Sequence, residues 1–196
     1  MTMTLVPRAF SGLVFVAALA ACGGGGGGGT DGGSASIVVP SPSAATVAGV
    51  EPCNIPDLAA QALAAVNAVR AGERSCRGTR YPAVAALSWD NRLAQAASTH
   101  AADMAGYDHV EHVDRTGRTL GTRITGAGYN WSSVAENLAA GRATLDGAIE
   151  GWLSSSSGHC ENLMRASVTQ MGLSCQRRAG TRYTTYWALE LARPAN

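Results

Sequence analysis

Apolar residues recur along the chain with two different spacings, and the change from one to the other separates predicted helices from predicted strands. A first stripe at helical spacing follows Asp57, a residue type that favours helix N-termini, and runs to Arg70. Its members are Leu58, Ala62, Val66 and Val69. A second, longer helix is predicted after Asp90, with His100 among the residues of its inward stripe. The others are Leu93, Ala97, Ala101 and Met104.

Shorter elements follow in the second half of the chain. Helical segments are predicted at 120–125, after Thr144 and at 159–164, whereas alternating apolar and polar positions predict strands. The strand candidates are 133–138, 171–175 and 183–191, the last two joined as a hairpin by 176–182. Because helices come first and in the middle and an antiparallel hairpin comes last, the order indicates an α+β fold and not a parallel wound sheet.

The N-terminal segment follows neither spacing. An apolar run from Phe10 ends in a Leu-Ala-Ala-Cys sequence at Cys22, and the run is too short to cross a bilayer as a helix. These four residues resemble the lipobox of bacterial lipoproteins, which implies that 1–21 are a signal peptide and that lipidated Cys22 anchors the exported protein in a membrane. Gly23 stands where such lipoproteins carry an aspartate for inner-membrane retention, so the resemblance implies the outer membrane, facing the periplasm or the cell exterior. The alternative is an ordinary secretory signal cleaved near the same alanines; it also exports the protein.

Composition separates a linker from a domain. Seven consecutive glycines follow Cys22, and the chain up to about residue 50 is almost free of large apolar side chains. Such a segment buries too little surface to offset its ordering entropy. We therefore predict a flexible tether over 22–52 and one domain over 53–196. The formal net charge of +1 gives no field that would favour nucleic acid as a partner.

Four cysteines remain besides Cys22, and in an oxidising compartment four thiols allow three disulfide pairings. We predict the two local pairs, Cys53 with Cys76 and Cys160 with Cys175. The first would fix the first helix to the loop after it, and the second would tie a helix start to the following strand. A zinc site made of these cysteines is the alternative, but no C-x-x-C spacing supports it.

The four histidines differ in their surroundings. His100 lies on the inward stripe of the second helix, which is typical of a core histidine with satisfied hydrogen bonds. His109 and His112 lie in a polar loop, and His159 stands at a helix start, so these three are the accessible imidazoles.

Several short motifs follow one another along the domain. They are Leu87-Ser88-Trp89-Asp90 with Leu93, His100-Ala101-Ala102-Asp103-Met104, His112 with Gly117, Gly128-Tyr129, Ala135-Glu136-Asn137-Leu138-Ala139, Trp152, Gly158-His159 with Asn162, Met171-Gly172 and Tyr186-Trp187. In this order, over 54–192, they resemble the bacterial branch of the CAP superfamily, which groups cysteine-rich secretory proteins, venom antigens and plant pathogenesis-related proteins. The resemblance implies a three-layer α-β-α sandwich with a central antiparallel sheet and an open cleft.

In that family the cleft gathers two histidines and two acids. Matched by motif, the histidines are His112 and His159, the first acid is Glu136, and the second acid falls at Ser155. Two imidazoles and one carboxylate can hold Zn²⁺ or another divalent cation, with open positions for water. A hydrogen-bonded cluster that only organises the cleft is the alternative. His109 replaces an aromatic residue of the family, as an extra ligand or as a surface substitution.

The resemblance carries no agreed catalytic activity, so no residue is assigned as catalytic. We expect a lipid-anchored binding or interaction module of the bacterial cell envelope, with a lipid, a sterol-like molecule or an envelope protein as partner. One alternative is a metal-assisted hydrolase with Glu136 as general base. Another is a structural envelope protein without ligand. A serine hydrolase built on the serines at 154–157 lacks the G-x-S-x-G elbow. Asn137 and Asn162 are expected to bind backbone and not ligand.

Overall fold

The computed structural model describes residues 47–196. The predicted signal peptide, the lipidation site at Cys22 and the tether up to residue 46 lie outside the described residues. Glu51 and Pro52, which the sequence assigns to the tether, form a short strand, β1 (Glu51–Pro52), so the ordered fold begins slightly before the predicted boundary.

The predicted helices are present with closely similar bounds. They are α1 (Leu58–Arg70), α2 (Asn91–Tyr107), α3 (Leu120–Gly126), α4 (Leu145–Leu153) and α5 (His159–Leu163). Side chains of Asp90, Thr119 and Thr144 accept hydrogen bonds from backbone N–H groups in the first turns of α2, α3 and α4. Asp57 occupies the N-cap position of α1 but has a left-handed backbone, with φ 49°, and its side chain makes no capping hydrogen bond.

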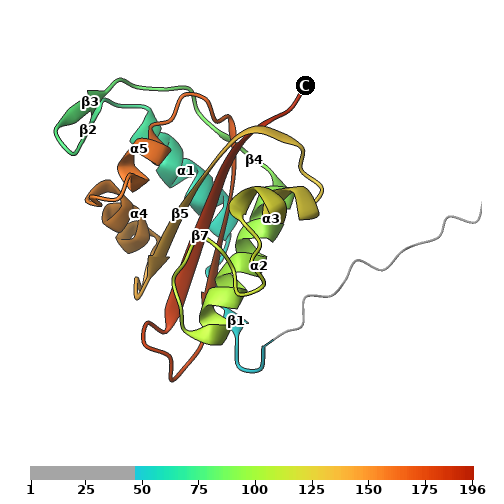
Figure 1. Cartoon of the computed structure of the whole chain (residues 1–196). Helices are drawn as coiled ribbons and strands as arrows, with labels where there is room; N and C mark the ends of the chain where they lie inside the picture. Colours follow the sequence, from blue (N-terminus) through green and yellow to red (C-terminus); the bar gives the residue numbers. More distant parts are fainter. Residues whose placement is uncertain (1–46) are drawn as a thin grey trace, which may run out of the picture. The chain divides into compact units, whose positions relative to one another are not determined.

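The central sheet has the strand order β1-β6-β7-β5, with β5 (Trp131–Ala140), β6 (Gln170–Arg177) and β7 (Thr185–Pro194) as its long antiparallel members. The short strand β4 (Ser88–Trp89) pairs with β6 in parallel. A separate hairpin, β2 (Arg74–Cys76) with β3 (Thr79–Tyr81), lies in a segment that the sequence assigns to a loop. The α+β fold with a mainly antiparallel sheet is confirmed (Figure 1).

Helices cover both faces of the sheet, which gives three layers (Figure 1). On β7, Trp187, Leu189 and Leu191 belong to the core shared with α1, α4 and α5, whereas Tyr186 and Ala188 belong to the core shared with α2. This division follows from the alternation of side chains along a strand. Among the described helices, none is at once long and apolar enough to cross a bilayer.

Helix α2 approaches β6 so closely that only a glycine fits between them. A Cβ atom at Gly172 of β6 would lie 2.0 Å from the backbone nitrogen of Ala94. The many alanines on the inward face of α2 allow the same close approach along its length. The small residues of both elements therefore fix the spacing between helix and sheet.

The predicted disulfide pairing is wrong. The disulfides join Cys53 to Cys175 and Cys76 to Cys160, with Cα–Cα distances of 5.5 and 5.6 Å. Cys53 follows β1, which pairs with the end of β6 that carries Cys175. Cys76 lies at the end of β2, in the hairpin that contacts α5. The local prediction failed because the strand order brings residues together that are 122 and 84 positions apart in sequence.

Candidate functional site

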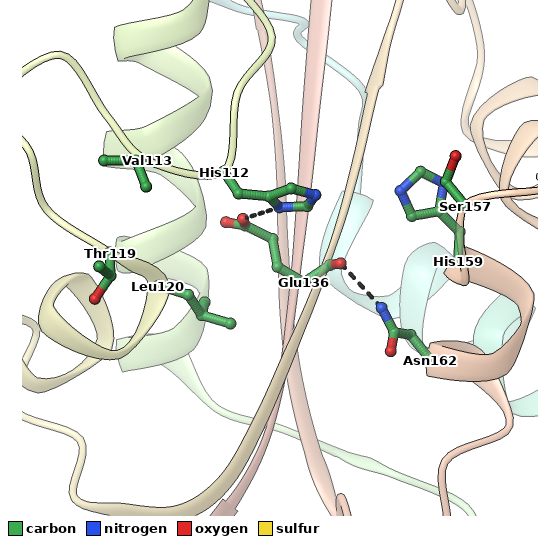
Figure 2. Close-up of a pocket in the computed structure, with 8 residues that line it drawn as sticks. All are labelled: His112, Val113, Thr119, Leu120, Glu136, Ser157, His159 and Asn162. Atoms are coloured by element: carbon green, nitrogen blue, oxygen red, sulfur yellow. Dashed lines mark hydrogen bonds and ion pairs between the residues drawn. The ribbon is translucent and has the colours of Figure 1, made fainter.

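A cleft of about 320 Å³ opens over β5, an edge strand of the sheet. Its lining comes from both sides of that strand: from the loop after α2 and the start of α3, and from the segment that leads into α5. The lining residues are His112, Val113, Thr119, Leu120, Glu136, Ser157, His159 and Asn162 (Figure 2). Segments far apart in sequence therefore meet in one open hollow.

A hydrogen bond orients His112 in this cleft. Its Nδ1 lies 2.7 Å from Oε1 of Glu136, and its side chain is 61% exposed whereas that of Glu136 is 2% exposed. With Nδ1 bonded to the carboxylate, Nε2 is the nitrogen left for a ligand. The hydrogen bond and the negative charge of Glu136 raise the pKa of His112, although partial burial opposes this.

Glu136 also forms an ion pair with a buried arginine. Arg123 of α3 donates from Nη2 to Oε2 of Glu136, and its Nη1 donates to the backbone carbonyl of His112 at 2.9 Å. Burial alone would raise the pKa of Glu136, but the hydrogen bond from His112 and the charges of Arg123 and His100 outweigh it, so the pKa is lowered. Glu136 is therefore an ionised group with both oxygens already paired.

Two further buried titratable side chains complete this cluster. His100 is fully buried, and its Nε2 lies 2.9 Å from the backbone carbonyl oxygen of Glu111 and 3.8 Å from Oε2 of Glu136. Its burial lowers its pKa despite the carboxylate nearby. This confirms His100 as a core residue, although its Nδ1 has no hydrogen-bond partner among the described residues. The second, Glu190 of β7, is fully buried and directly opposite Glu136 in the β5–β7 register.

The surroundings of Glu190 strongly perturb the pKa of its carboxyl group. Burial, together with the negative charge of Glu136, raises the pKa of Glu190 well above its usual value, and Arg123 at 3.9 Å opposes this only in part. The sequence contains a signal for this residue that our prediction did not use. Glu190 is an acidic residue between Leu189 and Leu191, in the apolar run of a buried strand.

His159 faces His112 from the other side of β5 (Figure 2). Asn137 of β5 donates to the backbone carbonyl of His159 at 2.9 Å, and Asn162 of α5 donates to the backbone carbonyl of Glu136 at 3.2 Å. The expectation that both asparagines bind backbone is confirmed. Partial burial and the charge of His112 lower the pKa of His159.

The other candidates lie outside the cleft lining. Ser155, at the family's second acid position, accepts a hydrogen bond from the backbone nitrogen of Ser157, and Ser157 is the serine that lines the cleft. His109 places Nε2 3.3 Å from Oδ2 of Asp103 and is not a lining residue. Arg123 could not be identified from the sequence, because its role depends on contacts with Glu136 that no local spacing reveals.

The cleft offers fewer available metal ligands than the two imidazoles and one carboxylate expected from the sequence. Within residues 47–196, no three His, Cys, Asp or Glu side chains are arranged to hold an ion. Because Glu136 is occupied by His112 and Arg123, the nitrogen donors that remain are Nε2 of His112 and the ring of His159. The cleft therefore offers two imidazoles, one of which is oriented by the carboxylate of Glu136.

The chain resembles several known proteins in sequence and structure. A relative in Bacillus subtilis (strain 168), "Uncharacterized membrane protein YlbC", is 30% identical over 95 residues, which are 48% of this chain and 27% of that protein. The chain thus matches about a quarter of that relative. An extracellular protein with an SCP domain from Bacillus anthracis str. Ames aligns with a TM-score of 0.55 and 26% identity over 68% of this chain and 39% of the other.

An outer surface protein of Borrelia burgdorferi has the same fold, with a TM-score of 0.51 and 20% identity over 57% of this chain and 80% of that one. The model of the cysteine-rich secretory protein family, CAP, matches residues 63–191, which include every residue of the cleft. This chain belongs to CAP, the cysteine-rich secretory protein family.

Proposed function

We propose that this protein is an exported binding module of the bacterial cell envelope, and that its cleft binds ligand through His112 and His159. The observation that carries the proposal is the hydrogen bond from Nδ1 of His112 to Glu136, which leaves Nε2 free toward an open cleft. The extracellular SCP-domain relative from Bacillus anthracis supports export. A carboxylate behind a histidine is also how many proteins orient a metal-binding imidazole.

A divalent cation such as Zn²⁺ is the first ligand to test. His112 and His159 would hold it, and when bound it would supply a Lewis acid with open positions. Titration calorimetry of the purified protein with Zn²⁺ should give one binding event that His112→Ala or His159→Ala weakens at least about tenfold, since each removes one of two ligands. His109→Ala is the matched control, because His109 lies outside the cleft lining. Equal Zn²⁺ binding in all four proteins would refute the cation site.

The cleft also suits a small organic ligand. Val113 and Leu120 are apolar members of its lining, next to the imidazole of His112, and Val113 is 48% exposed. Such a surface fits a lipid or sterol-like molecule that has one polar group. Native lipid recovered by mass spectrometry from the purified protein would support this ligand class. An envelope protein captured through the same residues is the other partner that we propose. Repeated extractions without lipid would favour the protein partner.

Membrane attachment through lipidated Cys22 is part of the same proposal. In a Gram-negative host the protein should fractionate with the outer membrane, and mass spectrometry should find acyl chains on its N-terminal cysteine. Cys22→Ser should release the protein into the soluble exported fraction, because the domain would lose its acyl chains. Retention of the Cys22→Ser protein in the membrane would contradict the anchor.

The hydrolase alternative fits this geometry poorly. A general base needs an accessible lone pair, whereas Glu136 is 2% exposed and both of its oxygens are paired. We therefore propose binding without turnover. Hydrolysis of ester or peptide substrates that disappears in Glu136→Gln would reverse this choice. If neither Zn²⁺ nor any organic molecule binds, the purely structural alternative remains.

A further inference from the structure

Helix α5 cannot hold its own first residue in place. It has five residues, which is too short for an independent helix, and His159 is the first of them. The His159 imidazole makes no hydrogen bond with any residue in 47–196, unlike that of His112. The direction of this ring therefore depends on how firmly the backbone around it is fixed.

The hairpin formed by β2 and β3 contacts α5 at two residues and the segment before α5 at a third. Cys76 forms the disulfide with Cys160, Arg77 forms an ion pair with Glu161, and Nη1 of Arg77 donates to the backbone carbonyl of Ser156 at 3.3 Å. The contacted positions lie three residues before His159 and one and two residues after it. One small hairpin therefore brackets the cleft histidine on both sides along the chain.

The turn of the hairpin directs Arg77 toward this contact. Arg77 and Gly78 are its central residues, and both have positive φ, 50° and 83°. Two such residues form the tight turn that suits the twist of a β-hairpin. Residues other than Gly, Asn or Asp are unfavourable in this conformation. Arg77 therefore occupies a strained backbone position while its side chain contacts α5.

On its other side α5 is bound to the sheet. Asn162 donates to Asn137 Oδ1 at 3.0 Å and to the backbone carbonyl of Glu136, and Asn137 donates to that of His159. The helix thus contacts β5 on one side and the hairpin on the other (Figure 1), and residues of β5 and α5 line the cleft (Figure 2).

We propose that the β2–β3 hairpin is a clamp that positions His159 opposite His112, with Arg77 and Glu161 as positioning residues that never touch the ligand. The proposal rests on the proposed function insofar as the clamp sets ligand affinity. Its structural content, the placement of the His159 ring, stands independently of any ligand.

Arg77→Ala tests the clamp at its polar contacts. The readout is the imidazole ¹H–¹³C spectrum of the metal-free protein, with the Zn²⁺ dissociation constant measured in parallel. We expect the His159 signals to shift and broaden while those of His112 stay in place, and Zn²⁺ to bind roughly tenfold more weakly. Arg77→Lys, which keeps the charge opposite Glu161, should restore most of the His159 spectrum.

The same hairpin supplies a matched control. Arg80 pairs with Glu73 at 2.8 Å, and both side chains are more than half exposed and lie outside the α5 contact. Arg80→Ala should therefore leave both the His159 spectrum and the Zn²⁺ affinity unchanged. A general loosening of the hairpin would instead affect the two arginine variants alike, which would overturn the specific role of Arg77.

The disulfides give a second, independent comparison. The double variant Cys76→Ser with Cys160→Ser should perturb the His159 signals, whereas Cys53→Ser with Cys175→Ser, which opens the disulfide at β1, should not. Unchanged His159 signals in both Arg77→Ala and the Cys76 and Cys160 double variant would overturn the clamp. If those signals move but wild type binds no Zn²⁺, the clamp holds and the proposed cation site fails.

Discussion

Glu136 and Glu190 face each other directly across β5 and β7, and both side chains are almost completely buried. Two ionised carboxylates in this position would repel each other strongly, and Arg123 supplies a single positive charge. Accordingly, the pKa of Glu136, which pairs with His112 and Arg123, is lowered, whereas the pKa of Glu190 is raised well above its usual value. We therefore expect Glu136 to ionise at a lower pH than Glu190.

The first prediction concerns Glu190→Gln. The pKa of Glu190 is raised in the folded protein, so folding retains a proton that the unfolded chain loses above about pH 4.3. The stabilising effect of the neutral acid is complete below that pH and is lost as pH rises toward the folded pKa. Glutamine has a similar shape but does not ionise. The variant should therefore gain stability relative to wild type as pH rises from 4 to 8, a window set by that reference value. Denaturant unfolding at several pH values measures this. Parallel pH profiles for the two proteins would contradict it.

The second prediction concerns the order of histidine pKa values. The pKa of His112 should lie above the usual value near 6.5, and those of His100 and His159 below it. The stabilising contribution of His112 is therefore present below that value and disappears as pH rises through its folded pKa. In Glu136→Gln the pKa of His112 should fall, because the carboxylate partner is lost. Titration followed by NMR gives each value; a His112 pKa at or below that of His159 would be incompatible with the observed hydrogen bond.

Gly172 provides the third prediction. In Gly172→Ala the new methyl group would lie 2.0 Å from the backbone nitrogen of Ala94, so α2 or β6 must move. We expect a loss of about 3 kcal/mol or more in the free energy of unfolding, at the upper end of overpacking effects. Gly126→Ala is the control, since a Cβ atom there meets nothing within 4 Å and the residue has no positive φ. Thermal and denaturant unfolding compare the two, and equal stabilities would show that the helix and sheet are not so tightly spaced.

The fourth prediction is the disulfide connectivity. Peptide mapping without reduction should recover Cys53 linked to Cys175 and Cys76 linked to Cys160. Each bond closes a long loop, so removing either pair by serine substitution should destabilise the domain by roughly 2 to 5 kcal/mol. Recovery of peptides that link Cys53 to Cys76 would disprove this topology.

The spacing of apolar residues in the sequence was sufficient to predict the helices and strands that repeat their buried positions regularly. The helical spacing of Leu58 to Val69 and of Leu93 to Met104 predicted α1 and α2, because an amphipathic helix repeats its buried positions every three or four residues. Strict alternation predicted β6 and β7. The hairpin at Arg74–Tyr81 was missed, because its strands have three residues each and show no apolar alternation.

Some residues of the candidate site could be predicted from the sequence and others could not. His112, Glu136 and His159 came from the motif resemblance, and all three line one cleft. Arg123 and Glu190, which set the charge of Glu136, are visible only when α3, β5 and β7 are packed together. The disulfides were mispredicted for the same reason, since nearness in sequence says little about partners that strand order brings together.

We propose above all that His112 and His159 together bind one divalent cation. The most direct test adds Zn²⁺ stepwise to the purified protein and follows all four imidazoles by NMR. We expect the signals of His112 and His159 to change together, with the same midpoint, while those of His100 and His109 stay unchanged. A change at His112 alone, or no change at either cleft histidine, would contradict it.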